Sequence, residues 1–200
     1  MITLISHSPK PVKFNERVRP GHSQLICGAF SEGGSFYAVG GVDHTIRIYS
    51  MDGPPCKIEE RTCHSDCVDS IQWSHSALCF ASGSRDGLAF IWRWEAQRWR
   101  TIKLDMALNQ VGSSTTATTT PVTNKVLVTM VGWSRDDRYV VTCSSDHLTR
   151  VWSAVDGALV RVIGGHTDDA FVVEAHPHDA NVVLTAGHDG AFSHVFSYIL

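Results

Sequence analysis

Short apolar and alternating runs recur along this chain and are separated by turn-forming residues. A representative stretch contains the runs 68–73 (VDSIQW), 78–82 (LCFAS) and 88–92 (LAFIW), with a fourth near 98–103. These runs are rich in β-branched and aromatic residues, which fit the pleated, half-buried surface of a sheet. A glycine follows Asp86, as suits a tight hairpin turn. The pattern predicts four short antiparallel strands joined by tight turns.

The same unit is present four times. Its most regular part is seen in AVGGVDHTIRIY (38–49), ASGSRDGLAFIW (81–92), VTCSSDHLTRVW (141–152) and LTAGHDGAFSHV (184–195). Each copy has an aspartate at the same point, and these are Asp43, Asp86, Asp146 and Asp189, at intervals of 43, 60 and 43 residues. Four strands in 43 residues, repeated along a chain, are typical of the blades of a β-propeller.

The sequence therefore predicts an all-β fold, a partial β-propeller of about four blades that are each a four-stranded antiparallel sheet. The repeats span about 21–50, 64–93, 126–153 and 166–196 within a repeat region that covers 21–200. The last unit stops just past its third strand, so we expect this blade to be incomplete. Residues 1–20 carry little strand signal and supply at most the outer strand of a preceding blade.

Residues 105–124 are the largest departure from the repeat. They contain GSSTTATTTPVT (112–123), a Ser/Thr-rich run with little apolar surface to bury. The segment lies between the second and third units, where the third unit has no histidine. We expect a mobile surface insertion there.

Composition and charge narrow the class of protein. The chain has 200 residues, of which 43% are hydrophobic and 18% are charged, as in a globular protein with a real core. Acidic and basic residues are interspersed and give a net charge of −3, so we expect no basic surface that would follow a phosphate backbone. No apolar run approaches the roughly 20 residues of a membrane span, and a secretory signal pattern is missing. An intracellular protein without nucleic-acid or membrane partners is predicted.

The cysteines indicate neither a disulfide framework nor a metal site. The six cysteines lie mostly inside apolar runs and form no CxxC pair, so reduced, buried thiols are expected. The one cluster, Cys56, Cys63, His64 and Cys67, lacks the usual spacing of zinc ligands. No metal or other cofactor is predicted.

One segment raises the question of catalysis. SGSRDGLAFIW (82–92) contains Ser82 and Asp86, and His64 precedes Ser82 by eighteen residues, so a Ser–His–Asp hydrolase is one hypothesis. A nucleophile needs an exposed hydroxyl beside a base and an oxyanion site, and the segment lacks the G-x-S-x-G pattern. The same residue types recur in unit after unit. This repetition favours a structural role in which they satisfy buried polar groups.

The four units resemble the WD repeats of β-propellers. In that family each blade is held by a tetrad of the turn aspartate, a Ser or Thr four residues before it, a Trp six residues after it and a His in the preceding loop. The resemblance implies the structural residues His64, Ser82, Asp86 and Trp92; Thr142, Asp146 and Trp152; His166, Thr185 and Asp189; and His22 and Asp43. The second unit alone is complete. The fourth has Val195 in place of the tryptophan, and the first has Val39 and Tyr49 in place of the serine and the tryptophan.

A closer resemblance is seen within the family. VDSIQW, SGSRDG, IKLDMA, VTMVGW and AGHDG are similar to the propeller of the bromodomain and WD-repeat-containing proteins, which include the pleckstrin-homology-domain-interacting protein. This resemblance implies an interior part of a larger propeller, from a nuclear, chromatin-associated transcription regulator that acts as a substrate receptor of a cullin-4 ubiquitin ligase. The strand exits WRWE (92–95) and WSAV (152–155) lack the Trp-Asp-x-Arg pattern that such receptors often carry. The alternative is a WD-repeat adaptor without a role in chromatin.

Both alternatives predict a non-enzymatic scaffold that binds proteins or peptides. WD repeats display on one face the residue before each turn aspartate and two alternating residues at the start of the inner strand. At the same sequence distances before each turn aspartate, these positions are Gln24, Ile26 and Val42; Cys67, Asp69 and Arg85; Leu127, Thr129 and Ser145; and Ala170, Val172 and His188. The main candidates for binding a partner are Arg85, Asp69, His188, Gln24, Ser145 and Thr129. The Arg85 guanidinium suits a carboxylate or phosphate of a partner, unless it only pairs with Asp69.

Overall fold

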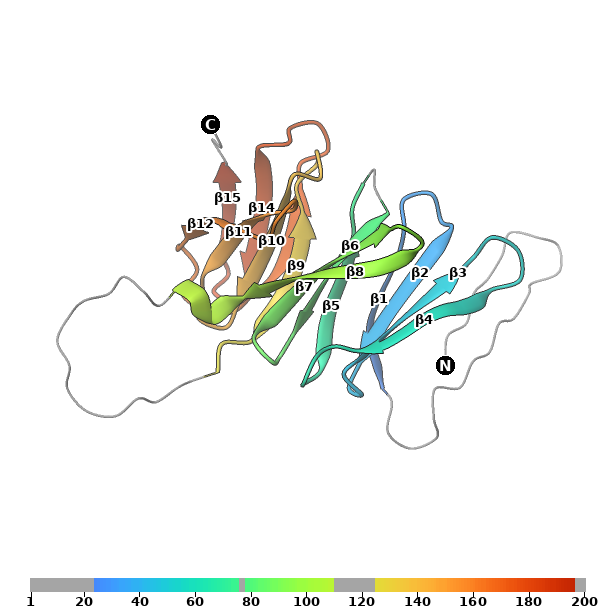
Figure 1. Cartoon of the computed structure of the whole chain (residues 1–200). Coiled ribbons are helices and arrows are strands. Elements are labelled where there is room, and N and C mark those ends of the chain that lie inside the picture. Colours follow the sequence, from blue (N-terminus) through green and yellow to red (C-terminus); the bar gives the residue numbers. More distant parts are fainter. Residues whose placement is uncertain (1–23, 76–77, 110–124, 197–200) are drawn as a thin grey trace.

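The computed structural model consists of antiparallel sheets that follow one another in chain order (Figure 1). It describes residues 24–75, 78–109 and 125–196. Blades 1, 2 and 3 have four strands each, and the described part of blade 4 has three. The predicted all-β partial propeller is confirmed. The N-terminal segment 1–20, His22 and the Ser/Thr-rich run 112–123 lie outside the described residues.

The strands of each blade run from the inner strand to the outer one. Blade 1 contains β1 (Leu25–Phe30), β2 (Phe36–Gly41), β3 (Thr45–Ser50) and β4 (Cys56–Thr62). Blade 2 contains β5 (Val68–Trp73), β6 (Cys79–Ser84), β7 (Leu88–Glu95) and β8 (Arg98–Asp105), followed by the 3₁₀ turn η1 (Met106–Asn109). Blade 3 contains β9 (Val128–Trp133), β10 (Tyr139–Ser144), β11 (Thr149–Ser153) and β12 (Leu159–Ile163), and blade 4 contains β13 (Ala170–Ala175), β14 (Val182–Gly187) and β15 (Phe192–Phe196). No helix in these described ranges is long and apolar enough to cross a membrane.

The turn after each aspartate needs a residue with positive φ. That residue is Gly87 in blade 2 and Gly190 in blade 4, with φ of 86° and 70°. In blades 1 and 3 it is His44 and His147, both with φ of 63°. Glycine adopts this conformation without steric cost, whereas histidine does so only where the surroundings hold it. The four turns therefore form two chemically different pairs.

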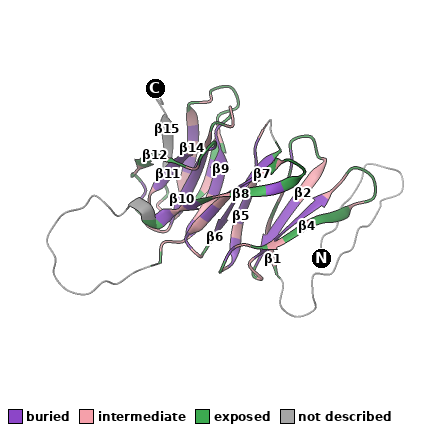
Figure 2. Ribbon diagram, viewed as in Figure 1, coloured by how far each residue is buried: buried purple, intermediate pink, exposed green. Residues whose placement is uncertain are grey.

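The core lies between blades and not inside a single sheet. The middle strands β3, β6 and β10 are buried along almost their whole length, whereas the outer strand β4 is largely exposed (Figure 2). Tryptophans join neighbouring inner strands, because Trp73 Nε1 donates to Ala29 O at 2.9 Å and Trp133 Nε1 donates to Gln72 O at 3.0 Å. Each bond satisfies the indole N–H while its ring fills the space between two blades. Every blade thus depends on its neighbour for burial.

Blade 4 departs from the register expected from the sequence. Six residues separate the last paired residues of β5 and β6, Trp73 and Phe80, whereas seven separate Ala175 and Val183 in β13 and β14. Because of this extra residue, Ala175 takes the position of Trp73, and the residue thirteen before Asp189, His176, lies in the hairpin loop. Counting back from Asp189 is therefore wrong by one residue in β13.

Close packing between blades predicts an intolerant position at Gly83 in β6. A Cβ atom built there would lie 2.7 Å from Val128 Cγ1 and 2.8 Å from Val131 Cγ1, and both valines are fully buried. We expect Gly83→Ala to lower the free energy of unfolding by about 1–3 kcal/mol, measured by urea denaturation. Gly33→Ala is the control, since a Cβ there meets no atom within 4 Å. Equal stability of the two variants would contradict this packing.

Candidate functional site

The predicted Ser–His–Asp group forms a buried chain of hydrogen bonds in blade 2. His64 Nδ1 lies 2.9 Å from Asp86 Oδ2, and His64 Nε2 lies 3.0 Å from Ser82 Oγ. Trp92 Nε1 donates to the same Ser82 oxygen at 3.0 Å. An ionised Asp86 accepts the proton on Nδ1, so Nε2 is left to accept the Ser82 hydroxyl proton. The four side chains therefore satisfy one another.

Ser82 is buried and inaccessible to a substrate. Its exposed fraction is 0%, and the Trp92 ring covers the hydroxyl that a nucleophile would need to present. The order of contacts is that of a catalytic triad, but the oxygen faces an indole and not an open site. The geometry favours the structural role over the hydrolase alternative.

Blade 4 repeats the histidine chain. His166 Nδ1 lies 3.0 Å from Asp189 Oδ2, and His166 Nε2 lies 2.9 Å from Thr185 Oγ1. The amide of Thr167 also donates to Asp189 Oδ2, as Ser65 does to Asp86 in blade 2. The side chain of Val195, which replaces the tryptophan, lies outside the described residues.

Blades 1 and 3 bind the turn aspartate in another way. In blade 1 Arg47 Nη2 lies 2.6 Å from Asp43 Oδ2. In blade 3 Arg150 Nη1 donates to Asp146 Oδ1 at 3.1 Å, and its Nη2 contacts the second carboxylate oxygen. Both arginines are buried and stand four residues after the aspartate. Neither arginine belongs to the predicted tetrads, although the repeated D-H-x-x-R at 43–47 and 146–150 is a sequence signal for both.

The predicted residues Thr142, Asp146 and Trp152 do not form one network. They make two separate contacts. Trp152 Nε1 donates to Thr142 Oγ1 at 2.9 Å, while Asp146 pairs with Arg150. In place of a histidine, Met106 from η1 lies beside the threonine, with Thr142 Oγ1 and Met106 Sδ 3.5 Å apart. A thioether has no hydrogen to donate, so Met106 cannot bind Asp146 as a histidine would, and Arg150 donates to the carboxylate instead.

The buried hydrogen bonds of blade 2 predict that Ser82→Ala destabilises the fold. The change leaves His64 Nε2 and Trp92 Nε1 buried without their shared partner, which costs about 1–3 kcal/mol of unfolding free energy. Ser65→Ala is the matched control, since Ser65 is exposed and contacts Asp86 only through its backbone amide. Urea denaturation of both variants measures the difference. If Ser82→Ala unfolds at the same urea concentration as Ser65→Ala, the buried chain does not stabilise the blade.

Low pH should lower the stability of blade 2. Burial of Asp86 acts to raise its pKa, but hydrogen bonds from His64 and from the amides of Ser65 and Leu88 outweigh burial and lower the pKa to about 2. Because this value is below that of an unfolded aspartate, the stabilisation is present above about pH 4 and is lost as the pH falls toward 2. We expect Asp86→Asn to show a smaller loss of stability over this range than the unchanged chain, by denaturant titration at each pH. Asp52→Asn, at an exposed turn position, should keep the full dependence.

The surface candidates lie around the four turns, and a β-bulge in each inner strand creates this surface. The ladder shifts register once in β1, β5, β9 and β13, and the residues left unpaired are Ile26, Asp69, Thr129 and Phe171. The backbone N–H groups of Val42, Arg85, Ser145 and His188 bond to the carbonyls of Gln24, Cys67, Leu127 and Asp169. We call these twelve residues the turn face. A bulge re-aims its extra side chain, and here it does so once per blade.

In blade 4 the structure corrects two predicted surface residues. Ala170 is buried and Val172 is half-buried, because the longer β13–β14 hairpin shifts the count by one. Asp169 and Phe171 take their places on the turn face. The exposed Phe171 ring packs against His188, with ring centroids 4.4 Å apart.

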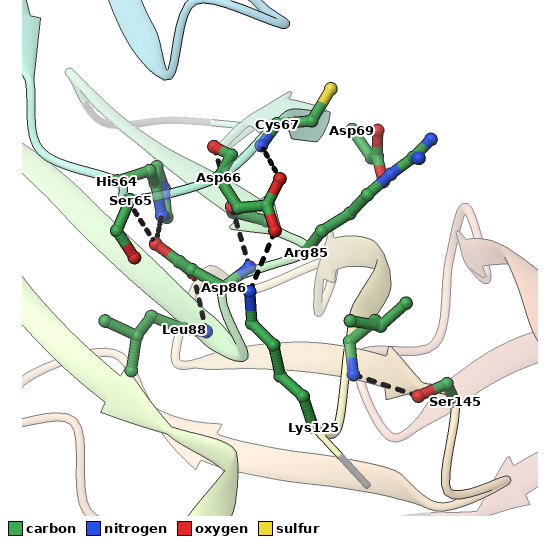
Figure 3. A network of polar contacts seen from close by, with 12 residues as sticks. His64, Ser65, Asp66, Cys67, Asp69, Arg85, Asp86, Leu88, Lys125 and Ser145 are labelled. Atoms are coloured by element: carbon green, nitrogen blue, oxygen red, sulfur yellow. Dashed lines mark hydrogen bonds and ion pairs between the residues drawn. The ribbon is translucent and has the colours of Figure 1, made fainter.

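Arg85 and Asp69 are brought together, as Figure 3 shows from close by. Arg85 Nε donates to Asp69 Oδ2 at 2.7 Å, and this contact raises the pKa of the arginine. The two Nη groups of Arg85 have no partner among the described residues, and 54% of its side chain is exposed. Asp69 thus aims the guanidinium and leaves its two terminal amino groups for a partner.

The other candidates on the turn face differ in character. Gln24 is exposed, whereas Ser145 Oγ accepts the Leu127 amide at 2.9 Å, and Thr129 Oγ1 donates to Ala170 O. Beside the pair in blade 2, Lys125 Nζ lies 2.8 Å from Asp66 Oδ2, and this contact lowers the pKa of Asp66. The turn face is apolar at blade 1, charged at blade 2, polar at blade 3 and aromatic at blade 4.

The prediction that the cysteines are buried is confirmed for Cys67, Cys79 and Cys143 and is wrong for Cys56, which is exposed. All six cysteines are free thiols, and burial raises the pKa of Cys27 and of Cys63 to about 12, so both stay protonated at neutral pH. Within the described ranges one group, His147, Asp168 and Asp169, places three ligand atoms within 4.8 Å of one another. These residues lie at the surface, and nothing else at this position indicates an ion.

Comparison with known families identifies the repeat. The WD40 family, described as WD domain, G-beta repeat, matches residues 15–50, 56–93 and 115–153, which are more than half of the chain. The chain belongs to the WD-repeat family. Blade 4 lies beyond these three matches, although its turn repeats the histidine chain of blade 2.

Curated relatives of this WD-repeat chain are much longer proteins. A bromodomain and WD repeat-containing protein of Dictyostelium discoideum is 28% identical over 173 residues, which are 85% of this chain and 8% of that protein. Protein HIRA of the same organism is 30% identical over 133 residues, or 60% of this chain and 11% of HIRA. A chromatin assembly factor 1 subunit FAS2 homolog of Oryza sativa subsp. japonica is 26% identical over 141 residues, or 64% of this chain and 25% of that protein. The resemblance to bromodomain and WD-repeat-containing proteins is confirmed.

A solved structure has the same fold. Sqt1 of Chaetomium thermophilum, bound to the N-terminus of the ribosomal protein L10, superposes with a TM-score of 0.69 at 20% identity. The superposition covers 86% of this chain and 43% of the Sqt1 chain. The described blades therefore correspond to part of a larger WD propeller.

Proposed function

We propose that this WD-repeat chain is a non-enzymatic scaffold that binds a protein segment on its turn face. The observation that carries the proposal is the Arg85 side chain, which Asp69 holds through Nε while both Nη groups remain free and exposed. A guanidinium held in this way suits a carboxylate of a partner, because two parallel hydrogen bonds form with little loss of side-chain entropy.

The rest of the turn face offers contacts of other kinds to the same segment. Ile26 and Val42 are exposed apolar residues in blade 1, and Phe171 with His188 provides an aromatic surface in blade 4. An anchored arginine between apolar and aromatic patches is typical of the energetically important part of a protein interface. The protein N-terminus bound in the Sqt1 structure supports a peptide as the ligand.

The setting that we propose is chromatin in the nucleus. Support comes from the relatives, which include protein HIRA and a chromatin assembly factor 1 subunit homolog. The role of a cullin-4 substrate receptor stays a prediction from the resemblance. Co-precipitation of the ligase adaptor with the full-length parent protein tests that role, and failure of the adaptor to co-precipitate would contradict it.

Site-specific photo-crosslinking tests the turn face directly. A photoreactive amino acid placed at Gln24 or Phe171 should crosslink partner proteins in cells, since both side chains are exposed on the turn face and their replacement leaves Arg85 in place. The same amino acid at Lys57, on the outer strand β4 of blade 1, is the control. Mass spectrometry of the crosslinked species identifies the partners and shows whether they are chromatin proteins.

Two outcomes separate the proposal from its alternatives. Crosslinks from Gln24 or Phe171 that disappear in an Asp69→Ala background would show that the held guanidinium of Arg85 matters. Crosslinks from Lys57 alone would place the interaction elsewhere and contradict the proposal.

A further inference from the structure

The β7–β8 hairpin of blade 2 is a second exposed feature, far from the turn face. Both strands have eight residues, more than any other strand in the described ranges, and they remain paired up to Glu95 and Arg98. A two-residue turn closes the hairpin, with positive φ at Ala96 and Gln97. Figure 1 shows β8 as the long outer strand of its blade. We call residues 93–100 the hairpin end.

The strand register decides which side chains share a face of the hairpin end. Ile91 pairs with Ile102, and both pack into the core between blades 2 and 3. Two residues further along each strand, Arg93 pairs with Arg100 and so lies on the same face. Arg93 Nη2 donates to Ala154 O of blade 3 at 2.6 Å, which places this face beside blade 3.

The next pair on this face is Glu95 and Arg98. The face therefore carries three guanidinium groups and one carboxylate. Arg93 and Arg100 are directly opposite each other, an arrangement that is destabilising for like charges in an antiparallel pair. The hairpin end needs more negative charge than it contains.

Glu95 supplies this charge incompletely. Its carboxylate is shared between two arginines, at 3.4 Å from Arg93 Nη1 and 3.8 Å from Arg100 Nε. Both distances exceed the roughly 2.7–2.9 Å of a charge-assisted hydrogen bond. Arg98 makes no ion pair with any residue that the structure describes, and Arg100 is 54% exposed at its side chain. Arg98 and Arg100 are thus two exposed guanidiniums with unused donors on one face.

An exposed apolar side chain lies next in sequence to the residue that binds Arg93. Val155 follows Ala154, the residue that binds Arg93, and it is 73% exposed. Exposed arginines next to an exposed apolar side chain are typical of a surface that binds a protein. A nucleic acid would need a longer basic stripe, and the chain as a whole has a net charge of −3.

We propose that the hairpin end binds an acidic protein segment. A carboxylate of that segment bridges Arg98 and Arg100, where Glu95 leaves donors free, and an apolar side chain of the segment covers Val155. Since β7 extends from the turn face to the hairpin end, about 23 Å separate the two surfaces, and both can be occupied at once. The proposal is independent of a ligand on the turn face.

Binding of a defined peptide tests the proposal. A fluorescein-labelled peptide of glutamate, aspartate and leucine residues is titrated with the chain, and its anisotropy is measured at increasing NaCl. We expect saturable binding that weakens with salt and is about tenfold or more weaker in the double variant Arg98→Gln/Arg100→Gln. Lys57→Gln/Lys103→Gln removes the same charge from exposed positions of β4 and β8 outside this face and should bind as the unchanged chain does.

Three further measurements make the test specific. A peptide with glutamine and asparagine in place of the acids should not bind, and Arg85→Gln on the turn face should leave unchanged the fold-loss of affinity that Arg98→Gln/Arg100→Gln causes. Thermal melting should show that all variants remain folded. The proposal is overturned if the unchanged chain does not bind the acidic peptide, if both double variants weaken binding equally, or if a labelled single-stranded oligonucleotide binds the hairpin end more tightly than the peptide does.

Discussion

The turn aspartate of each blade imposes the strongest constraint on this structure. Its carboxylate binds the backbone of the turn and is shielded from water fully in blades 2 and 4 and partly in blades 1 and 3, so it needs a charged or polar partner within the blade. A partner from the preceding loop, His64 or His166, ties two segments together, whereas Arg47 or Arg150 comes from the strand that follows. Both solutions avoid an unpaired buried charge, which is far more costly than an unpaired neutral group.

The choice of partner goes together with the residue that closes the turn. Where histidine binds the aspartate, the turn closes with Gly87 or Gly190, and where arginine binds it, the turn closes with His44 or His147. Among the described residues the two kinds of partner alternate from blade to blade. One fold thus accepts two ways of neutralising the same carboxylate.

These buried polar side chains hydrogen-bond to one another. The side chains that remain available to a partner therefore lie on the surface. Asp86, His64 and Ser82 have the contacts of a catalytic triad, yet Trp92 binds the serine oxygen and the core encloses it. The blades that these hydrogen bonds hold together support side chains at the two ends of the strands. At one end a bulge re-aims one side chain per blade, and at the other the long β7–β8 hairpin exposes arginines.

The sequence by itself determined the repeat, the all-β fold and the residues of the complete blade, because hairpin turns and strand alternation are local and recur at a constant spacing. It did not reveal the partners of Asp43 and Asp146, since a donor four residues away reaches the carboxylate only when the strand follows the turn in the observed conformation. The tertiary structure also decided the surface of blade 4, where one extra residue in a hairpin moved Phe171 outward and Ala170 inward. The pairing of Arg93 with Arg100 was likewise invisible along the chain, because the register between two strands decides which charges face each other.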